Sequence, residues 1–242
     1  MKVEGRNAVY ELLKTDKEID KILVQKDLKD DASKRLINVI RSHKIKLQPV
    51  DKYVIEKESE SKRHQGFIAY VSDYKYFDLE DVIDDCKDKD GLVVVLNEIL
   101  DPHNLGSIIR VCECAGADGI IIGKDRSASV SDTVMRISAG ALNHIKVAKV
   151  TNINNAIDKL KDNGFWVYGA EVGGGNIYKS NLTGKICLVI GGEDSGVKRL
   201  TKEKCDGIIS IPMFGKVNSL NASVACGIAV YEVVRQRVLS EK

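Results

Sequence analysis

The sequence contains little proline, few aromatic residues and no long hydrophobic run. It has 3 Pro and 1 Trp in 242 residues, and its longest uninterrupted aliphatic run is Leu92–Leu96. A membrane-spanning helix needs about 20 apolar residues, so no membrane span is expected. Charged residues interrupt Met1–Leu13, which argues against a signal peptide. Hydrophobic residues still make up 43% of the chain, so we expect a folded protein with a core rather than a disordered one.

The cysteines lack the spacing of a metal or redox motif. None of the 6 cysteines forms a C-x-x-C pair, and a helix would place Cys112 and Cys114 on different faces. We interpret them as reduced, buried thiols of a cytoplasmic protein with no metal site.

Several nucleotide-binding and catalytic motifs are also missing. No G-x-G-x-x-G follows the first expected parallel strand, and neither G-x-S-x-G nor H-E-x-x-H occurs. The glycine triplet Gly173–Gly175 follows a later strand and is interpreted as a flexible turn. These absences disfavour the usual dehydrogenases, serine hydrolases and zinc proteases. A small-molecule α/β enzyme of another kind stays open as an alternative.

Charge divides the chain into three parts, although the net charge is only +2. Residues 1–76 carry a balance of +4, residues 77–90 a balance of −5, and residues 91–242 a balance of +3. We expect an N-terminal domain over residues 1–76, an acidic linker or a short helix capped by Asp78 over residues 77–90, and a second domain over residues 91–242. The two basic parts suit a polyanion partner, but ordinary solvated surface explains them equally well.

The hydrophobic pattern predicts an α/β fold in both domains. In residues 1–76 it predicts helices over 3–13 and 32–43 and strands over 21–25 and 67–71. In residues 91–242 it predicts alternating strands and helices with a mostly parallel sheet of about six strands. The strands are expected over 91–96, 119–122, 147–150, 165–170, 186–190 and 208–211, and the helices over 105–115, 131–142, 153–161 and 222–239.

The first informative segment is Asn97–Arg110. Asn104 falls where a helix begins, just after Pro102, and Arg110 follows six residues later near the same face. The pair could form a polar site. Alternatively, Arg110 only extends its aliphatic stem over apolar surface with its charge in water.

The second informative segment is Leu188–Val197. A strand ends at Gly191 and Gly192, and Glu193 follows. Open α/β sheets bind ligands at the carboxyl ends of their strands, and glycine lets a ligand approach the backbone there. A plain strand-to-helix turn is the alternative.

The third segment, Ile209–Ala225, runs from a strand through a loop into the last helix. Asn221 and Ser223 are good helix caps, and capping alone would explain them. The loop Met213–Leu220 is nevertheless long and polar for a simple connection.

Together, in this order and spacing, the three segments resemble the motifs of the SpoU (TrmH) family of the SPOUT superfamily, RNA ribose 2′-O-methyltransferases that use S-adenosylmethionine. Val3–Val9 and Arg63–Gly66 resemble the N-terminal domain of one subgroup. That domain has a ribosomal-protein-like α/β fold and binds RNA, and the subgroup methylates a guanosine in the peptidyl-transferase loop of bacterial 23S rRNA.

The resemblance implies a deep trefoil knot in the C-terminal domain, a homodimer formed through that domain, and no metal. It also implies a role for each matching residue. The catalytic group would be Arg110, Asn104, Glu193, Ser219 and Asn221. The cofactor-binding group would be Gly191, Ile211, Met213 and Leu220. The RNA-binding group would be Arg6, Asn7, Arg63 and His64.

In such an enzyme a ribose 2′-hydroxyl would attack the sulfonium methyl group. The family's candidate for activating that hydroxyl is Arg110, as base or as electrostatic stabiliser. A guanidinium gives up its proton only at high cost, so we favour stabilisation, with Asn104 orienting the Arg110 side chain.

Three alternatives remain open. The substrate could be tRNA, or a different position of rRNA, because the same motifs serve all of these. The chain could be a non-catalytic RNA-binding or ribosome-assembly factor that kept the fold. Within the N-terminal domain, Arg63 and His64 could merely begin a surface strand.

Overall fold

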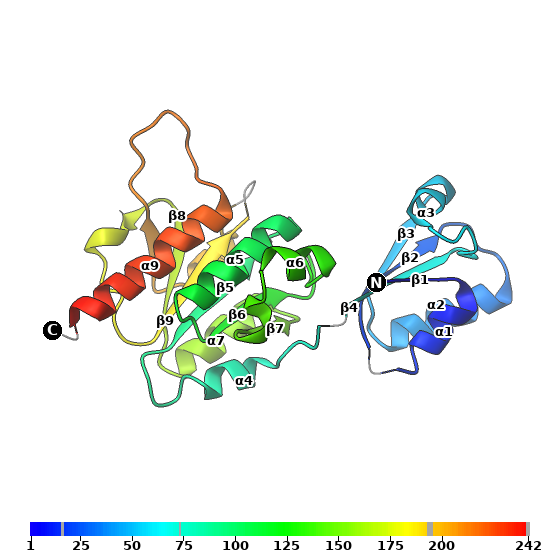
Figure 1. Ribbon diagram of the computed structural model, residues 1–242, viewed down its shortest axis with the longest axis horizontal. Helices are drawn as coiled ribbons and strands as arrows, with labels where there is room; N and C mark the ends of the chain where they lie inside the picture. Colours follow the sequence, from blue (N-terminus) through cyan, green and yellow to red (C-terminus); the bar gives the residue numbers. More distant parts are fainter. Residues whose placement is uncertain (16, 73, 193–195, 241–242) are drawn as a thin grey trace. The chain divides into compact units, whose positions relative to one another are not determined.

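The computed structural model describes residues 1–242 except residues 16, 73, 193–195 and 241–242. The chain forms two compact units, Met1–Lys75 and Tyr76–Lys242, each with its own sheet (Figure 1).

The first unit is a mixed sheet in the order β1-β4-β2-β3 with helices on both faces. Helices α1 and α2 bury Val9, Leu36 and Ile40 against one face of the sheet. Helix α3 buries Ile55 against the other face. The elements of this unit are β1 (Lys2–Glu4), α1 (Arg6–Leu12), β2 (Glu18–Gln25), α2 (Asp31–Ser42), β3 (Leu47–Val50), α3 (Lys52–Glu58) and β4 (Phe67–Ser72).

The sequence-based prediction for this unit is incomplete in two places. The helix predicted from residue 3 begins only at Arg6, because Lys2–Glu4 pairs with β4 and Gly5 turns the chain at φ 101°. Strand β3 and helix α3 were not predicted. Strand β3 contains Pro49, and this is tolerated because β3 is an edge strand of the sheet.

The second unit is a parallel sheet in the order β10-β8-β9-β5-β6-β7. This confirms the predicted parallel α/β architecture. Its elements are α4 (Leu79–Asp84), β5 (Leu92–Asn97), α5 (Pro102–Cys114), β6 (Gly119–Gly123), α6 (Asp132–Ile137), the 3₁₀ turn η1 (Ala141–Asn143), β7 (Lys146–Val150), α7 (Ile153–Asp162), β8 (Trp166–Asn176), the 3₁₀ turn η2 (Ile177–Lys179), β9 (Ile186–Gly191), α8 (Arg199–Lys204), β10 (Gly207–Ser210) and α9 (Ala222–Ser240).

Helices cover both faces of this sheet, which explains the continuous apolar run of β5. Every residue of β5 is buried. Val93 and Val95 pack with α4 and α7 in one core cluster. Helices α5 and α9 lie side by side on the opposite face (Figure 1). A strand covered on both faces has no polar side, so its sequence shows no alternation.

The acidic stretch 77–90 contains a short helix, α4, which packs on the second unit. Leu79, Val82 and Ile83 are buried in the core cluster beside β5 and α7. At the start of the helix, Asp81 Oδ2 accepts a hydrogen bond of 2.9 Å from the backbone N–H of Asp78. Of the two alternatives predicted for this stretch, a linker and a short helix capped by Asp78, the structure contains the short helix.

Strand β8 is longer than predicted, and the interpretation of Gly173–Gly175 as a flexible turn is wrong. Strand β10 pairs Ile208 with Gly169 and then Ile209 with Gly175. The intervening residues of β8 therefore bulge away from the ladder before the strand resumes. The glycines allow this, because a Cβ on Gly174 would lie 2.6 Å from Ile208 O.

The helix predicted over residues 131–142 is also interrupted. Helix α6 ends at Ile137, and the backbone then takes positive φ values at Ala139 and Gly140 before the turn η1. A positive φ cannot continue an α-helix.

The cysteines are free, but one expectation about them fails. Cys114 is exposed and Cys205 is only half-buried, whereas the other four are buried as expected. In the part of the chain that the structure describes, no helix combines the length and the apolar character needed to cross a bilayer.

Candidate functional site

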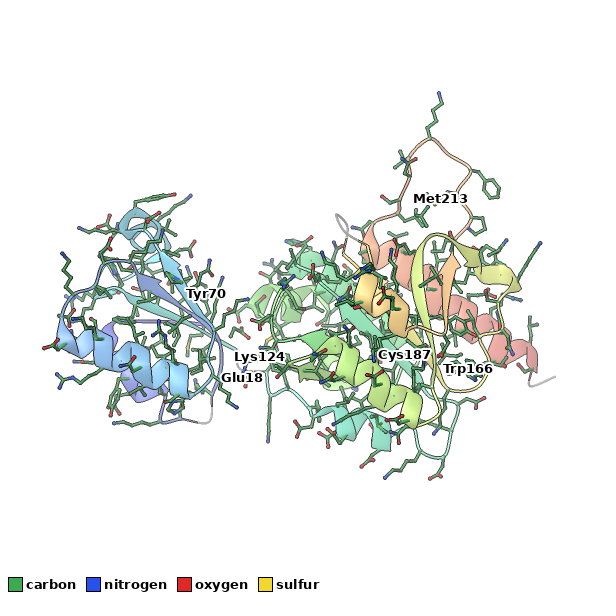
Figure 2. All side chains as sticks on the ribbon, turned by 180° about the vertical axis from the view of Figure 1, so that it is seen from behind. Glu18, Tyr70, Lys124, Trp166, Cys187 and Met213 are labelled. Carbon is green, nitrogen blue, oxygen red and sulfur yellow. The ribbon has the colours of Figure 1, made fainter. Side chains whose placement is uncertain are left out.

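A pocket opens where β8, β9 and β10 end and α9 begins. Its wall on one side is the bulge of β8, which contributes Ala170, Glu171 and Val172. On the other side is the segment between β10 and α9, which projects from this unit in Figures 1 and 2 and carries Met213. The remaining lining residues are Ile177, Ile190, Gly191, Gly192, Gly196, Ile209, Ser210, Ile211, Ser219, Leu220, Ala222 and Ala225.

This pocket brings together the residues that the resemblance assigns to the cofactor. All four of them line it, namely Gly191, Ile211, Met213 and Leu220. Ser219, from the expected catalytic group, lines it as well. Residues from 191 to 220 meet here because parallel strands present their carboxyl ends at the same edge of the sheet.

The glycines at the end of β9 are needed for a close approach of the chain to itself. A Cβ on Gly191 would lie 2.1 Å from the backbone carbon of Gly196, and one on Gly192 would lie 2.5 Å from Glu98 O. No real side chain tolerates such distances. The two glycines therefore allow the backbone at Gly196 and at Glu98 to lie against the end of β9, beside the pocket.

Asn221 links the third motif to the first. Its Oδ1 accepts hydrogen bonds from the backbone N–H groups of Ser223 (2.9 Å) and Val224 (3.3 Å), which confirms the predicted cap of α9. Its Nδ2 donates to Asn104 Oδ1 at 2.9 Å. Asn104 is buried near the start of α5. Capping alone therefore does not account for Asn221, since the same side chain also ties α9 to α5.

Arg110 lies elsewhere in this unit. It is exposed near the C-terminal end of α5 and does not line the cofactor-type pocket. Its own hollow is formed with Glu113, Ser138, Asn143 and His144. Six residues of helix separate it from Asn104, a rise of about 9 Å and a difference of about 120° around the helix axis. The prediction that the two lie near the same face is therefore wrong: Asn104 is buried and Arg110 is exposed. Arg110 also lines a different hollow from the pocket that Ser219 lines. Glu193, the remaining member of the expected catalytic group, lies outside the described residues.

Glu171 is a pocket residue that the sequence did not point to. Its Oε1 accepts a hydrogen bond of 2.5 Å from Lys202 Nζ on α8. Its Oε2 is buried and has no hydrogen-bond partner among the described residues. The only sequence signal was its position between the predicted strand 165–170 and a glycine triplet, which we interpreted as a turn.

A second hollow lies at the carboxyl ends of β5, β6 and β7. Asn97 is buried there, and its Oδ1 accepts a hydrogen bond of 2.9 Å from the backbone N–H of Lys198. Glu98 has a φ of 63° and forms ion pairs with Arg126 (3.2 Å) and Lys198 (3.1 Å). Asn97 and Glu98 thus hold the start of the first motif against the segment that follows the second.

In the first unit, the four expected RNA-binding residues come from two segments that touch. Arg6 and Asn7 begin helix α1, and Arg63 and His64 lie between α3 and β4. A Cβ on Gly5 would lie 3.3 Å from Arg63 O, and Gln65 Oε1 accepts a hydrogen bond from Arg6 N at 3.1 Å. Asn7 and Arg63 are exposed. His64 Nδ1 accepts from Gly66 N at 3.0 Å and so shapes its own turn, and Arg6 pairs with Asp30 at 2.9 Å.

Glu4 organises the loop that precedes Arg63. Its carboxylate accepts hydrogen bonds from the Ser59 hydroxyl (2.7 Å), Glu60 N (2.7 Å), Ser61 N (3.1 Å) and the Ser61 hydroxyl. Burial raises the pKa of Glu4, but these donors outweigh it and lower the pKa to about 2. The loop is therefore held by a carboxylate that stays ionised at neutral pH.

Comparison with known protein families gives two matches that together span most of the chain. Residues 91–231 match the SpoU rRNA Methylase family. Residues 2–77 match a family described as RNA 2′-O ribose methyltransferase substrate binding. A protein of Staphylococcus saprophyticus, which carries the provisional name TrmH family tRNA/rRNA methyltransferase, is 44% identical over 97% of this chain and 95% of its own length.

Solved structures show the same fold. The SpoU methyltransferase AviRb from Streptomyces viridochromogenes, solved in complex with the cofactor AdoMet, has a TM-score of 0.64 at 24% identity over 99% of this chain and 91% of its own. The TrmH/SpoU tRNA modifying enzyme of A. aeolicus has a TM-score of 0.58 at 29% identity over 67% of this chain and 82% of its own.

Proposed function

Because the chain belongs to the SpoU rRNA methylase family, we propose that it methylates the ribose 2′-hydroxyl of a guanosine in the peptidyl-transferase loop of 23S rRNA. The observation that carries this proposal is the gathering of Gly191, Ile211, Met213, Leu220 and Ser219 around one pocket. The chain is an S-adenosylmethionine-dependent RNA 2′-O-ribose methyltransferase of the SpoU/TrmH family.

The pocket suits S-adenosylmethionine. Its walls are mostly aliphatic, with Ile190, Ile209 and Ile211 among them, and a purine ring gains from such surroundings. Its polar members, which include Ser210 and Ser219, could hold the polar parts of the molecule. When bound, the cofactor supplies a methyl group on a positively charged sulfur, so the leaving group needs no further activation.

Within this proposal, the residues of the chain orient the reacting ribose and stabilise its charge. Asn104 and Asn221 form one hydrogen-bonded unit at the junction of α5 and α9, and Ser219 precedes it on the pocket wall. Arg110 would stabilise the alkoxide as the hydroxyl proton departs. This role requires the ribose to lie beside the exposed face of α5, where the Arg110 side chain is in reach.

The proposed substrate is that of the RlmB subgroup, and the N-terminal unit supports this choice of substrate. That unit presents Arg6 and Asn7 from the start of α1, and Arg63 and His64 from the adjoining segment before β4. RNA loops are recognised by shape, phosphate contacts and splayed bases, which such a surface can provide. A tRNA substrate is the second candidate, because relatives are named tRNA/rRNA methyltransferases and the A. aeolicus enzyme modifies tRNA.

We also propose that the protein is a homodimer through the C-terminal unit. Helix α9 carries Val224, Tyr231 and Val238 at seven-residue spacing, so they share one face, and each side chain is about half exposed. An apolar stripe of this kind on a terminal helix suits a second copy of the chain. A deep trefoil knot in this unit stays a prediction of the resemblance.

The free thiols suit a reducing compartment, and we place the protein in the cytoplasm. Cys112 and Cys226 Sγ atoms lie 3.9 Å apart in the core without forming a disulfide. Burial raises the pKa of the Cys86 thiol to about 12 and that of Cys205 to about 11. Such thiols remain protonated and unreactive at neutral pH.

The test is methyl transfer from labelled S-adenosylmethionine to unmodified 23S rRNA, with unmodified bulk tRNA in parallel and nuclease mapping of the product. We expect label in 2′-O-methylguanosine of the rRNA, abolished by Arg110→Ala. Arg136→Ala is the matched control, because Arg136 is an exposed arginine on the neighbouring helix α6. Arg110→Lys distinguishes a requirement for the planar guanidinium from a requirement for positive charge alone.

Label in tRNA alone would keep the chemistry and overturn the rRNA substrate. Binding of the cofactor with no label in either RNA, including assembly intermediates of the large ribosomal subunit, would favour the non-catalytic assembly factor.

A further inference from the structure

Glu171 is a charged residue of the pocket whose environment the proposed chemistry does not explain. It lies in the β8 bulge and is one of the residues that line the pocket formed by β8, β9 and β10. One oxygen, Oε1, is bound to Lys202 Nζ at 2.5 Å. The other, Oε2, is buried and has no partner among the described residues. A buried carboxylate oxygen without a donor is destabilising, so its position calls for a ligand that provides one.

Lys202 and Gly196 flank the carboxylate of Glu171. Lys202 comes from α8 and holds Oε1 from one side. A Cβ on Gly196 would lie 3.2 Å from the same Oε1, so the backbone there leaves little free space. With Oε1 held in this way, rotation of the carboxylate cannot exchange the two oxygens without breaking the ion pair with Lys202.

We infer that Glu171 is a cofactor-recognition residue, whose Oε2 accepts a hydrogen bond from a donor group on S-adenosylmethionine. This inference rests on the proposed cofactor pocket. The cofactor offers three kinds of donor with suitable chemistry: the ribose hydroxyl groups, the 6-amino group of adenine and the α-ammonium group of the methionine part. Lys202 acts as a positioning residue that keeps Oε2 available for such a donor.

The substitution Glu171→Gln tests the inference because Lys202 decides how the amide lies. The amide oxygen of the glutamine will face the Lys202 ammonium, since both the ammonium and the amide nitrogen are donors. The amide nitrogen then takes the place of Oε2. Its N–H group faces the donor group of the ligand, and two donors cannot form a hydrogen bond with each other. Removing a charged hydrogen bond in this way should weaken binding about ten- to a hundredfold.

The measurement is the affinity for S-adenosylhomocysteine by isothermal titration calorimetry on the full chain. This product carries all three kinds of donor and requires no turnover. The matched control is Glu203→Gln, which removes an exposed carboxylate paired with Arg199 on the same helix as Lys202. We expect wild type and Glu203→Gln to bind equally, and Glu171→Gln to bind at least tenfold more weakly.

A second ligand, 5′-methylthioadenosine, shows which part of the cofactor carries the donor. It keeps the ribose hydroxyls and the adenine 6-amino group and lacks the α-ammonium group. An equal loss for both ligands assigns the bond to the adenosine part. A loss for S-adenosylhomocysteine alone assigns it to the ammonium group.

The outcomes separate this inference from the proposed function. Wild type that fails to bind S-adenosylhomocysteine overturns the proposed cofactor pocket itself. Wild type that binds, with Glu171→Gln binding equally well, overturns only the role of Glu171. Thermal unfolding checks that the variant folds. If Glu171→Gln unfolds, Glu171→Asp decides, because it keeps the charge but withdraws the carboxylate by one methylene: loss of affinity supports the role and unchanged affinity refutes it.

Discussion

The neighbouring glycines Gly174 and Gly175 allow a paired test of how β8 shapes the pocket. A Cβ on Gly174 would lie 2.6 Å from Ile208 O and 2.7 Å from Ile208 C, both backbone atoms of β10. A Cβ on Gly175 would lie 3.7 Å from Ile208 O, an ordinary contact distance. The two alanine substitutions are therefore chemically identical and differ only in the space that they meet.

We expect opposite effects on the free energy of unfolding. Gly174→Ala forces β8 and β10 apart, and overpacking of this kind costs about 1–3 kcal/mol. Gly175→Ala meets no obstacle, and the lower entropy of its unfolded chain should stabilise the protein by about 0.4–1 kcal/mol. The two variants should thus differ by about 1.5–4 kcal/mol.

Urea unfolding followed by tryptophan fluorescence measures this difference directly. Trp166 is the one tryptophan of the chain, and it begins strand β8 (Figure 2). Its signal therefore reports on the second unit and not on Met1–Lys75. Because Ala170, Glu171 and Val172 of the bulge line the pocket, Gly174→Ala should also weaken binding of S-adenosylhomocysteine, while Gly175→Ala should not. Equal stabilities for the two variants would refute the ordered bulge and favour a flexible glycine turn.

Three further predictions concern other parts of the molecule. Glu4→Gln should destabilise the first unit by about 1–2 kcal/mol at pH 7 after allowance for solvent screening. Because the pKa of Glu4 is lowered from 4.5 to about 2 in the folded protein, this difference in stability should vanish as the pH falls from about 4.5 to 2. Hydrogen exchange of the β4 amides measures it, and a difference that does not depend on pH would contradict the prediction. Asn221→Ser keeps a capping hydroxyl but loses the hydrogen bond to Asn104. The melting temperature should therefore change little, while methyl transfer falls at least tenfold. If thermal stability and methyl transfer fall in parallel, capping is the only role of Asn221. Tyr231→Glu places a charge in the exposed stripe of α9 and should convert a dimer to a monomer in light scattering, and a dimer that persists would exclude this face as the interface.

The alternation of strands and helices in the second unit could be predicted because it is written in short-range patterns. Apolar runs such as Leu92–Leu96 belong to strands covered on both faces, and the apolar spacing of residues 153–161 belongs to a helix with one buried face. The first unit was predicted less completely. Its edge strand β3 contains Pro49 and shows no apolar run, and Lys2–Glu4 is a strand only because β4 lies beside it.

The candidate site was predictable in part through the resemblance, which assigned Gly191, Ile211, Met213 and Leu220 to one ligand. The structure places these residues around one pocket. It does not place Arg110 there. Six residues of helix place Asn104 and Arg110 about 120° apart around α5, and the structure buries Asn104 while Arg110 is exposed.

By itself, the sequence determined the α/β class, the order of most elements and the family, since all three depend on local apolar spacing and on short motifs. Only the tertiary structure decided that Asn221 binds Asn104 across 117 positions of the chain. Only the tertiary structure showed that Gly173–Gly175 forms part of a strand and that Glu171 lines the pocket with one buried oxygen that has no hydrogen-bond partner among the described residues. The physical reason is that each of these features depends on atoms brought close by the pairing of β8 with β10 or by the packing of α9 on α5. Such contacts leave no periodic signal in the segments that make them.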